Sequence, residues 1–232
     1  MGCTQSCNLN TTCLNVVPIF QGMTQEDLTI LQGVVTSRCF NKGEIVFREG
    51  ESSEALFIIQ KGLIKLTKVS VDGKEQIIRL LFKGDFFGQF SLLQNENHYA
   101  NAETLEETII CTVEKQPFID ALERSPNMAL RFISALNNRL HHADEWMSVL
   151  SLMDVEQRLA RVILLFSEKL TIADAQFTLP ISKKDLASLI GTTPETLSRK
   201  LVALVEKQIL VLKLRRDIQV VDHHKLKLIA GL

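Results

Sequence analysis

Three polar side chains with complementary chemistry stand close together near the C-terminus. Glu195, Ser198 and Arg199 are spaced i, i+3 and i+4, so they share one face if the segment is helical. A carboxylate, a hydroxyl and a guanidinium at one helix N-terminus are typical of a helix that reads the major groove of DNA. Arg199 can donate twice to guanine O6 and N7, and Glu195 can accept from cytosine N4. The alternative interpretation is a solvated Glu/Arg pair on an ordinary helical hairpin.

The segment that carries these side chains has the signals of two helices joined by a tight turn. Ser182, followed three residues later by Asp185, predicts a capping box at the start of the first helix. Gly191 predicts the end of that helix, and Thr193-Pro194 predicts the start of the second. The second helix is expected to pack through one apolar face, formed by Leu197, Leu201 and Leu204.

Hydroxyl and cationic side chains surround this unit, and we expect them to contact DNA phosphates. From residue 181 to 232 the chain has ten Lys/Arg and five Asp/Glu, although its overall net charge is −1. This local excess favours a polyanionic partner. Two short apolar runs, 209–214 and 218–221, flank Arg215-Arg216-Asp217 and predict a β-hairpin wing with a cationic tip. The candidate phosphate-contacting residues are Ser182, Lys183, Lys184, Thr192, Thr193 and Lys200.

The chain contains five cysteines: Cys3, Cys7, Cys13, Cys39 and Cys111. An odd count, in a chain that does not open with the pattern of a secretory signal, argues against a structural disulfide framework. Three of the five lie within the first thirteen residues, in a polar segment without periodicity that we interpret as an irregular arm over residues 1–17. This clustering requires a functional explanation.

Residues 18–125 are predicted to form a helix followed by an antiparallel sheet domain. Thr24 to Thr36 has a threonine N-cap and two acidic residues in its first turn, which predicts a helix. Asp72-Gly73 lies between two alternating runs and predicts a hairpin, and Lys83-Gly84-Asp85 predicts a second turn. Short β-branched and aromatic runs separated by glycine predict strands over 44–47, 55–59, 63–69, 76–81 and 86–88.

A long helix is predicted over residues 126–153, and another from Asp154 to Lys169 opens a C-terminal domain over 154–232. The apolar positions of the long helix alternate in steps of four and three, which is the pattern of a coiled-coil seam. We therefore expect it to pair with a second copy of the chain; the alternative is packing against its own domain. The seam consists of Ala129, Ile133, Leu136, Leu140, Ala143, Met147 and Leu150.

The order of a glycine-punctuated roll, a long heptad helix and a winged helix-turn-helix resembles the CRP/FNR family of bacterial regulators over nearly the whole chain. The resemblance rests on residues 42–47, 84–88, 156–160 and 193–201. It implies an α+β fold with an N-terminal antiparallel β-roll (a cyclic-nucleotide-binding-like jelly roll), a long dimerisation helix and a C-terminal winged helix-turn-helix. It also implies a cytoplasmic, homodimeric, non-enzymatic transcription regulator that binds duplex DNA and RNA polymerase, without a membrane segment. The reading helix resembles the FNR type, which implies a palindromic site with TTGA half-sites.

The cyclic-AMP branch of this family holds its nucleotide with a Gly-Glu pair and an Arg-Ser pair. Here Gly88-Gln89 stands in place of the first, and His98-Tyr99-Ala100-Asn101 stands where the second would be. No arginine occurs between Arg79 and Arg124, so a cyclic phosphate is expected to meet no guanidinium. We therefore do not expect the chain to bind cyclic AMP.

The FNR branch senses oxygen with a [4Fe–4S] cluster, and the resemblance implies that Cys3, Cys7, Cys13 and Cys111 are its ligands here. The arm spacing is C-x3-C-x5-C, whereas the FNR arm usually reads C-x2-C-x5-C. Cys39 has no family role and is expected to pack as a small hydrophobic residue. Three alternatives stay open: a dithiol switch between an arm cysteine and Cys111, a small-molecule effector in the roll, and a nucleotide-sensing module that does not bind DNA.

Overall fold

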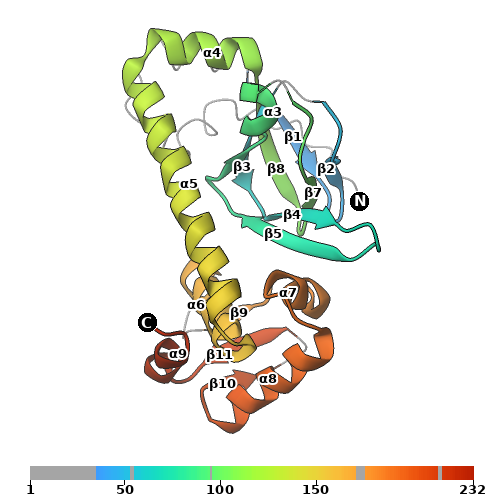
Figure 1. Ribbon diagram of the computed structural model, residues 1–232, viewed down its shortest axis with the longest axis vertical. Coiled ribbons are helices and arrows are strands. Elements are labelled where there is room, and N and C mark those ends of the chain that lie inside the picture. Colours follow the sequence, from blue (N-terminus) through green and yellow to red (C-terminus); the bar gives the residue numbers. More distant parts are fainter. Residues whose placement is uncertain (1–34, 53–54, 95, 171–175, 214–215) are drawn as a thin grey trace. The chain divides into compact units, whose positions relative to one another are not determined.

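The computed structural model describes residues 35–52, 55–94, 96–170, 176–213 and 216–232 (Figure 1). The chain divides into two compact units between His141 and His142. Cys3, Cys7 and Cys13 lie outside the described residues, as does most of the helix predicted from Thr24. Among the described helices, none is both long enough and apolar enough to cross a membrane.

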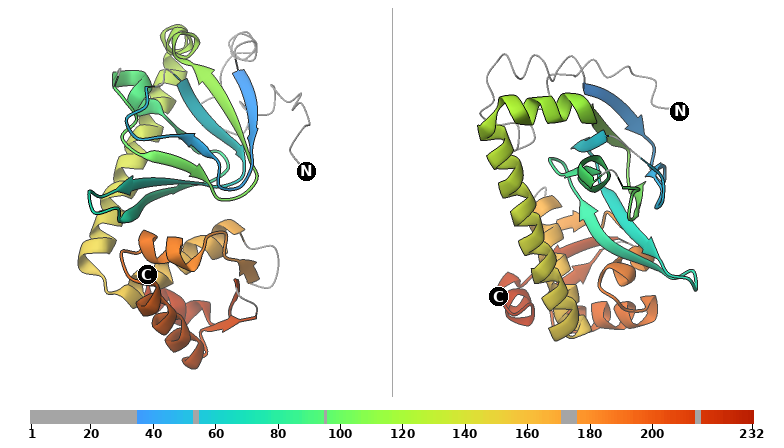
Figure 2. Two further views of the ribbon diagram at one scale, coloured as in Figure 1. Left: turned by 90° about the vertical axis from the view of Figure 1, so that its right-hand side faces the viewer. Right: turned by 45° about the horizontal axis from the view of Figure 1, so that its top comes forward.

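The first unit is a roll of two four-stranded antiparallel sheets, which confirms the predicted fold class (Figure 2). The strand order of one sheet is β1-β8-β3-β6, formed by Val35–Phe40, Thr108–Glu114, Ala55–Lys61 and Phe86–Phe87. The order of the other is β2-β7-β4-β5, formed by Ile45–Phe47, Asn101–Thr104, Ile64–Val69 and Glu75–Leu81.

Tight turns join the strands where glycine predicted them. At the end of β4, the Ser70 amide donates to Lys74 O at 2.9 Å and the Gly73 amide donates to Ser70 O at 2.9 Å, which closes the predicted hairpin. Gly88 follows β6 with a φ of +84°, and a Cβ there would lie 2.7 Å from Phe57 Cδ2. Position 88 therefore excludes any side chain both by backbone conformation and by space.

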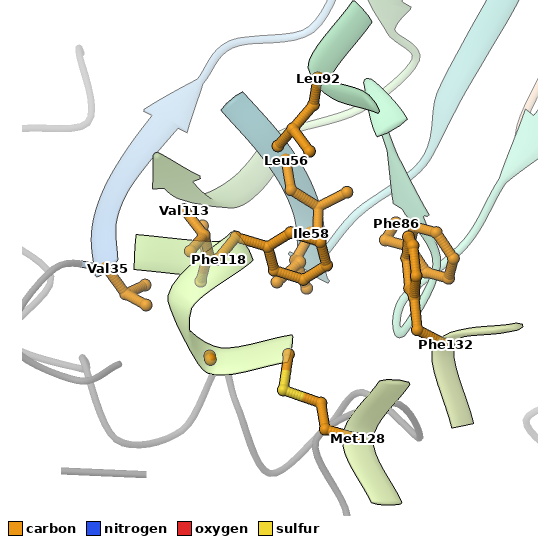
Figure 3. Close-up of a cluster of buried hydrophobic side chains, with 11 residues drawn as sticks. Val35, Leu56, Ile58, Phe86, Leu92, Val113, Phe118, Met128 and Phe132 are labelled. Carbon is orange, nitrogen blue, oxygen red and sulfur yellow. The ribbon is translucent and has the colours of Figure 1, made fainter. Parts of the chain in front are cut away.

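Three helices pack on the roll: α3 (Gln89–Gln94), α4 (Lys115–Arg124) and the first part of α5 (Pro126–Leu152). Phe118 of α4 and Phe132 of α5 meet edge to face, with ring centroids 5.2 Å apart. Phe132 also packs against Phe86, and Figure 3 shows these rings in a cluster with Leu56 and Ile58 of β3. This core fixes the start of α5 on the roll.

The helix predicted over Thr24–Thr36 is wrong at its C-terminal end. Val35 and Thr36 begin β1 and pair with Val113 and Thr112 of β8. The β-branched run from Val34 suits a pleated, half-buried surface, and Val35 is only 2% exposed, so pairing with β8 overrides the helical pattern.

The second unit combines a helix-turn-helix with a small sheet. Its helices are α6 (Val155–Leu170), α7 (Lys183–Leu189), α8 (Pro194–Glu206) and α9 (His223–Ile229). Its antiparallel sheet has the order β10-β11-β9, formed by Leu210–Leu212, Asp217–Val220 and Gln176–Thr178. The predicted wing hairpin is confirmed as β10 and β11, whereas β9 was not predicted.

Candidate functional site

The first helix of the helix-turn-helix, α7, begins at the predicted cap. The Ser182 side chain accepts from the Asp185 amide at 3.0 Å, and the Asp185 carboxylate accepts from the Ser182 amide at 3.3 Å. This capping box satisfies two of the amides that a helix N-terminus leaves without intrahelical partners. Leu186 and Ala187 then face inward and are buried.

The turn between α7 and α8 is a Schellman motif centred on Gly191. The Gly191 amide donates to Ser188 O at 3.2 Å, and the Thr192 amide donates to Ala187 O at 2.9 Å. Gly191 has a φ of +67°, and a Cβ there would lie 3.2 Å from Arg158 Nη1, which donates to Ile190 O at 2.8 Å. The turn that orients α8 therefore depends on a glycine and on an arginine of α6.

Gly191→Ala is expected to lower the stability of the second unit by about 1–2 kcal/mol, because alanine is strained in the left-handed region and would crowd Arg158. Thermal unfolding checks this. Gly231→Ala is the matched control for crowding, since Gly231 has the same φ of +67° but a Cβ there would lie at ordinary contact distance, 3.7 Å from Met153 Cε. An unfolding midpoint for Gly191→Ala equal to that of the parent would contradict this account of the turn.

The second helix, α8, presents the predicted face to solvent. Thr193 caps it by accepting from the Thr196 amide at 3.3 Å, with Pro194 in its first turn. The inward residues are at most 1% exposed and anchor the helix: Leu197, Leu201 and Leu204. Periodicity thus assigned both faces of this helix correctly.

Glu195 and Arg199 are exposed on the outer face of α8, and Ser198 is partly exposed between them. The Arg199 guanidinium donates from Nη2 to Thr196 Oγ1 at 3.1 Å, one turn back toward the helix N-terminus. This contact holds the guanidinium along the helix face. The face therefore combines a planar double donor with an acceptor, which is the chemistry that distinguishes a G·C pair in the major groove.

Lys200 has a partner that the sequence did not predict. Its Nζ lies 3.0 Å from Glu156 Oε2 of α6, and Lys207 pairs with the other carboxylate oxygen. Hydrogen bonds from Lys207 and Lys200 lower the pKa of Glu156 below its ordinary value. A phosphate contact by Lys200 must therefore compete with a carboxylate that stays ionised.

The wing lies next to α8 in the chain and carries basic residues. Arg216 is exposed, and Lys213 donates to Gln176 Oε1 of β9 at 2.9 Å. Arg215, at the predicted tip, lies outside the described residues. Strand β9 holds the hairpin through pairing of Phe177 with Ile218, both of which are buried.

One of the four predicted cluster ligands lies in the described part of the chain. Cys111 is fully buried on β8, between Ser37 of β1 and Ile58 of β3. Its sulfur lies 3.6 Å from Ser37 Oγ and 3.9 Å from Gln60 Oε1, and it is disulfide-bonded. Among the described residues no group of three metal-ligating side chains is found. Cys39 lies on β1 and is only partly buried.

The predicted seam of α5 separates into two sets of side chains. Ile133, Leu140 and Met147, at seven-residue spacing, are 60%, 62% and 61% exposed, and Ala143 is also exposed. Leu136 packs against the core of the roll, and Leu150 is partly buried. We call Ile133, Leu140 and Met147 the exposed stripe. Such evenly spaced apolar side chains on a long helix are typical of a protein contact.

Together, the β-roll and the capped helix-turn-helix define a regulator that binds DNA. Residues 37–125 match the family described as "Cyclic nucleotide-binding domain", and residues 157–229 match "Crp-like helix-turn-helix domain". The chain belongs to the CRP/FNR family of DNA-binding transcription regulators.

Curated relatives and solved structures are similar to most of this chain. The "Cyclic AMP receptor protein" of Thermus thermophilus is 29% identical over 82% of this chain and 86% of its own length. The "Anaerobic regulatory protein" of Pasteurella multocida is 26% identical over 89% of this chain and 75% of its own length. Among solved structures, FixK2 from Bradyrhizobium japonicum is 26% identical with a TM-score of 0.78, covering 84% of this chain and 97% of that one.

Proposed function

We propose that the chain is a homodimeric regulator that reads a palindromic site with TTGA-type half-sites through Glu195, Ser198 and Arg199. The observation that carries this proposal is the outer face of α8, where a guanidinium and a carboxylate are exposed above three buried leucines. A dimer places two such helices on half-sites about one helical turn apart. Ser182, Thr193 and Lys200 are the proposed phosphate contacts, and RNA polymerase is the proposed protein partner.

Arg199→Ala is expected to weaken binding by about 1–3 kcal/mol per half-site and to relax the preference at one G·C pair, because the double donor to guanine is lost. Selection from a pool of random duplexes, followed by affinity measurements on the selected site, checks both effects. The matched variant is Lys200→Ala on the same helix, which should weaken binding to all sequences alike and reduce the salt slope by about 1.

Thermal unfolding of the Lys200→Ala variant should accompany this experiment, because Lys200 also pairs with Glu156. If selection with the Arg199→Ala protein returned the same base preferences as the parent, the proposed orientation of α8 in the groove would be wrong.

We further propose that the protein responds to oxygen or redox state through a [4Fe–4S] cluster held by Cys3, Cys7, Cys13 and Cys111. Support comes from the similarity to an anaerobic regulatory protein and from the surroundings of Cys111. The Ser37 hydroxyl lies 3.6 Å from the sulfur and can donate to a thiolate, as groups around cluster ligands commonly do. The buried position of Cys111 among apolar strands also shields a ligand sulfur from water. A bound cluster would supply oxygen-sensitive iron–sulfur bonds.

The path from Cys111 to α5 is short along the chain. Cys111 is the middle residue of β8, three residues before Glu114. Glu114 is both the last residue of β8 and the N-cap of α4, and α5 follows α4 after one residue. A bond from a cluster or a disulfide to Cys111 would therefore also restrain β8, the strand whose last residue is the N-cap of α4. We propose that this connection biases how α5 pairs with its partner copy.

The dithiol switch is the second candidate for the sensor. The observation that favours it is that Cys111 is disulfide-bonded, since a reversible disulfide at this position would act on the same strand. Both candidates require a second cysteine sulfur beside Cys111, and iron content separates them.

A further inference from the structure

A row of polar side chains runs along α8 beside its buried leucines. Thr193, Thr196 and Arg199 follow one another at three-residue spacing, so they are neighbours on the helix surface. Roles for Thr193 and Arg199 were predicted from the sequence, whereas none was predicted for Thr196 between them. Thr196 is partly exposed, which places it at the border between the outer face of α8 and the buried face.

Hydrogen bonds join this row from the helix N-terminus to the reading arginine. The Thr193 side chain accepts from the Thr196 amide at 3.3 Å, and its hydroxyl donates to Thr196 Oγ1 at 3.2 Å. Arg199 Nη2 donates to the same Thr196 oxygen at 3.1 Å. The cap thus fixes Thr193, Thr193 holds the hydroxyl of Thr196, and Thr196 holds the guanidinium. Threonine is β-branched, so its side chain has few alternative rotamers on a helix.

The contact between Thr196 and Arg199 leaves enough donors for a base. A guanidinium has five N–H groups, and the hydrogen bond to Thr196 uses one of them. A guanine takes two, one for O6 and one for N7. A hydroxyl oxygen can accept two hydrogen bonds and still donate its own proton. Thr196 can therefore keep both of its partners while Arg199 contacts guanine.

Such a contact matters because an exposed arginine is mobile. Arg199 is exposed, and its long side chain must give up many rotamers when it binds a base edge. A hydrogen bond to a neighbour one turn back restricts these rotamers before DNA binds. An arginine held in this way loses less conformational entropy on binding. The gain is specific to the G·C pair, since a duplex without guanine at this position offers no partner for the double donor.

We propose that Thr196 is a positioning residue for Arg199, and that its hydroxyl sets how strongly α8 prefers the G·C pair. This role rests on the proposed function, in which Arg199 donates to guanine. Part of the base preference then comes from a side chain that need not contact a base. The rival role for a threonine at this place is a direct hydrogen bond to a phosphate, which would strengthen binding to all sequences alike.

Thr196→Val removes the hydroxyl but keeps the shape of the side chain. Valine is β-branched like threonine and has a similar helix propensity. The N-cap is retained, because Thr193 accepts from the backbone amide of residue 196. The unfolding midpoint should therefore stay close to that of the parent. Thr196→Ser is the matched variant, since it keeps the oxygen that holds Arg199.

Affinities of the full chain for two duplexes test this role. One duplex has two TTGA half-sites, and in the other an A·T pair replaces the G·C pair of each half-site. The ratio of the two affinities measures the preference for the G·C pair. Thr196→Val should lower this ratio by roughly 2–10-fold per half-site, which is the cost of ordering one long side chain on binding. The loss should fall on the TTGA duplex, and Thr196→Ser should keep most of the ratio.

Two further measurements show whether the effect passes through Arg199. In the Arg199→Ala background, Thr196→Val should lower the ratio no further, because the guanidinium that Thr196 positions is absent. In the protein without DNA, ¹⁵N relaxation of Arg199 Nε should show greater mobility after Thr196→Val and little change after Thr196→Ser. A role of Thr196 in stability alone would not produce this pattern.

The positioning role is overturned if Thr196→Val weakens binding to both duplexes by the same factor, which would make Thr196 a phosphate contact. It is also overturned if Thr196→Val leaves the ratio unchanged, or lowers it equally with and without Arg199. Arg199→Ala by itself tests the proposed function, because a parent-like ratio in that variant would reject the reading of guanine by Arg199. A ratio lost in Arg199→Ala but parent-like in Thr196→Val would reject the positioning role alone.

Discussion

Leu140→Glu is expected to convert the protein from a dimer to a monomer. In a paired α5, Leu140 would meet its own copy near the two-fold axis, between Ile133 and Met147 of the same stripe. Each buried leucine contributes about 1.5–3 kcal/mol, and the variant instead places two carboxylates opposite each other without partners. The dimer dissociation constant should rise by at least roughly 100-fold. Sedimentation velocity over a range of protein concentrations measures this change.

Asn138→Glu is the matched control, because Asn138 is exposed on the same helix but outside the seven-residue spacing of the stripe. It adds the same charge two residues away and should leave the protein dimeric. A Leu140→Glu protein that sediments like the parent would reject the exposed stripe as the dimer contact. The monomer should also bind a palindromic site weakly, since it reads only one half-site.

The helix-turn-helix could be predicted in detail because its signals are local. Ser182, Gly191 and Thr193 each act within four residues of themselves, through hydrogen bonds and a backbone conformation that depend little on the rest of the fold. The same is true of the Asp72-Gly73 hairpin. The long helix α5 was equally clear, because its heptad pattern extends over three repeats without a proline or glycine.

Features that depend on distant contacts were missed or misjudged. Strands β1 and β9 are short and pair with partners far away in sequence, such as Val113 for Val35 and Ile218 for Phe177. A local pattern cannot show that residues 35 and 36 pair with β8, and the predicted helix therefore extended into β1. The seam of α5 was likewise predicted to contact a second copy along its whole length, although Leu136 packs against the roll. Periodicity does not show whether an apolar side chain packs against its own domain or against a second copy of the chain.

The charged groups show the same limit. No residue near Lys200 in the sequence indicates that its ion-pair partner is Glu156, which lies 44 residues earlier. Arg79 and Arg139 are 60 residues apart in the sequence, yet burial and then the charge of Arg79 lower the pKa of Arg139.

Cys111→Ser is expected to abolish iron binding. After reconstitution with iron and sulfide under strict anaerobiosis, the parent should hold four irons per chain and show the visible absorption of a [4Fe–4S] cluster. Serine keeps the size of the side chain in the buried site on β8 but removes the thiolate. Cys39→Ser is the matched control, because Cys39 lies on the neighbouring strand β1, and it should retain all four irons. Iron analysis and absorption spectra before and after exposure to air measure the effect.

The same samples distinguish the cluster from the dithiol switch. A cluster predicts that the anaerobic parent contains iron and loses it in air, together with its affinity for the palindromic site. The Cys111→Ser protein should have the lower affinity even without air. A dithiol switch predicts that the protein binds no iron. It also predicts that the number of titratable thiols of the parent falls on oxidation and recovers with a reducing agent, whereas the Cys111→Ser protein shows no such fall. Four irons in the Cys111→Ser protein would overturn the assignment of Cys111 as the fourth ligand. Cys39 is then the other cysteine among the described residues that could be the ligand, and the Cys39→Ser control tests it directly.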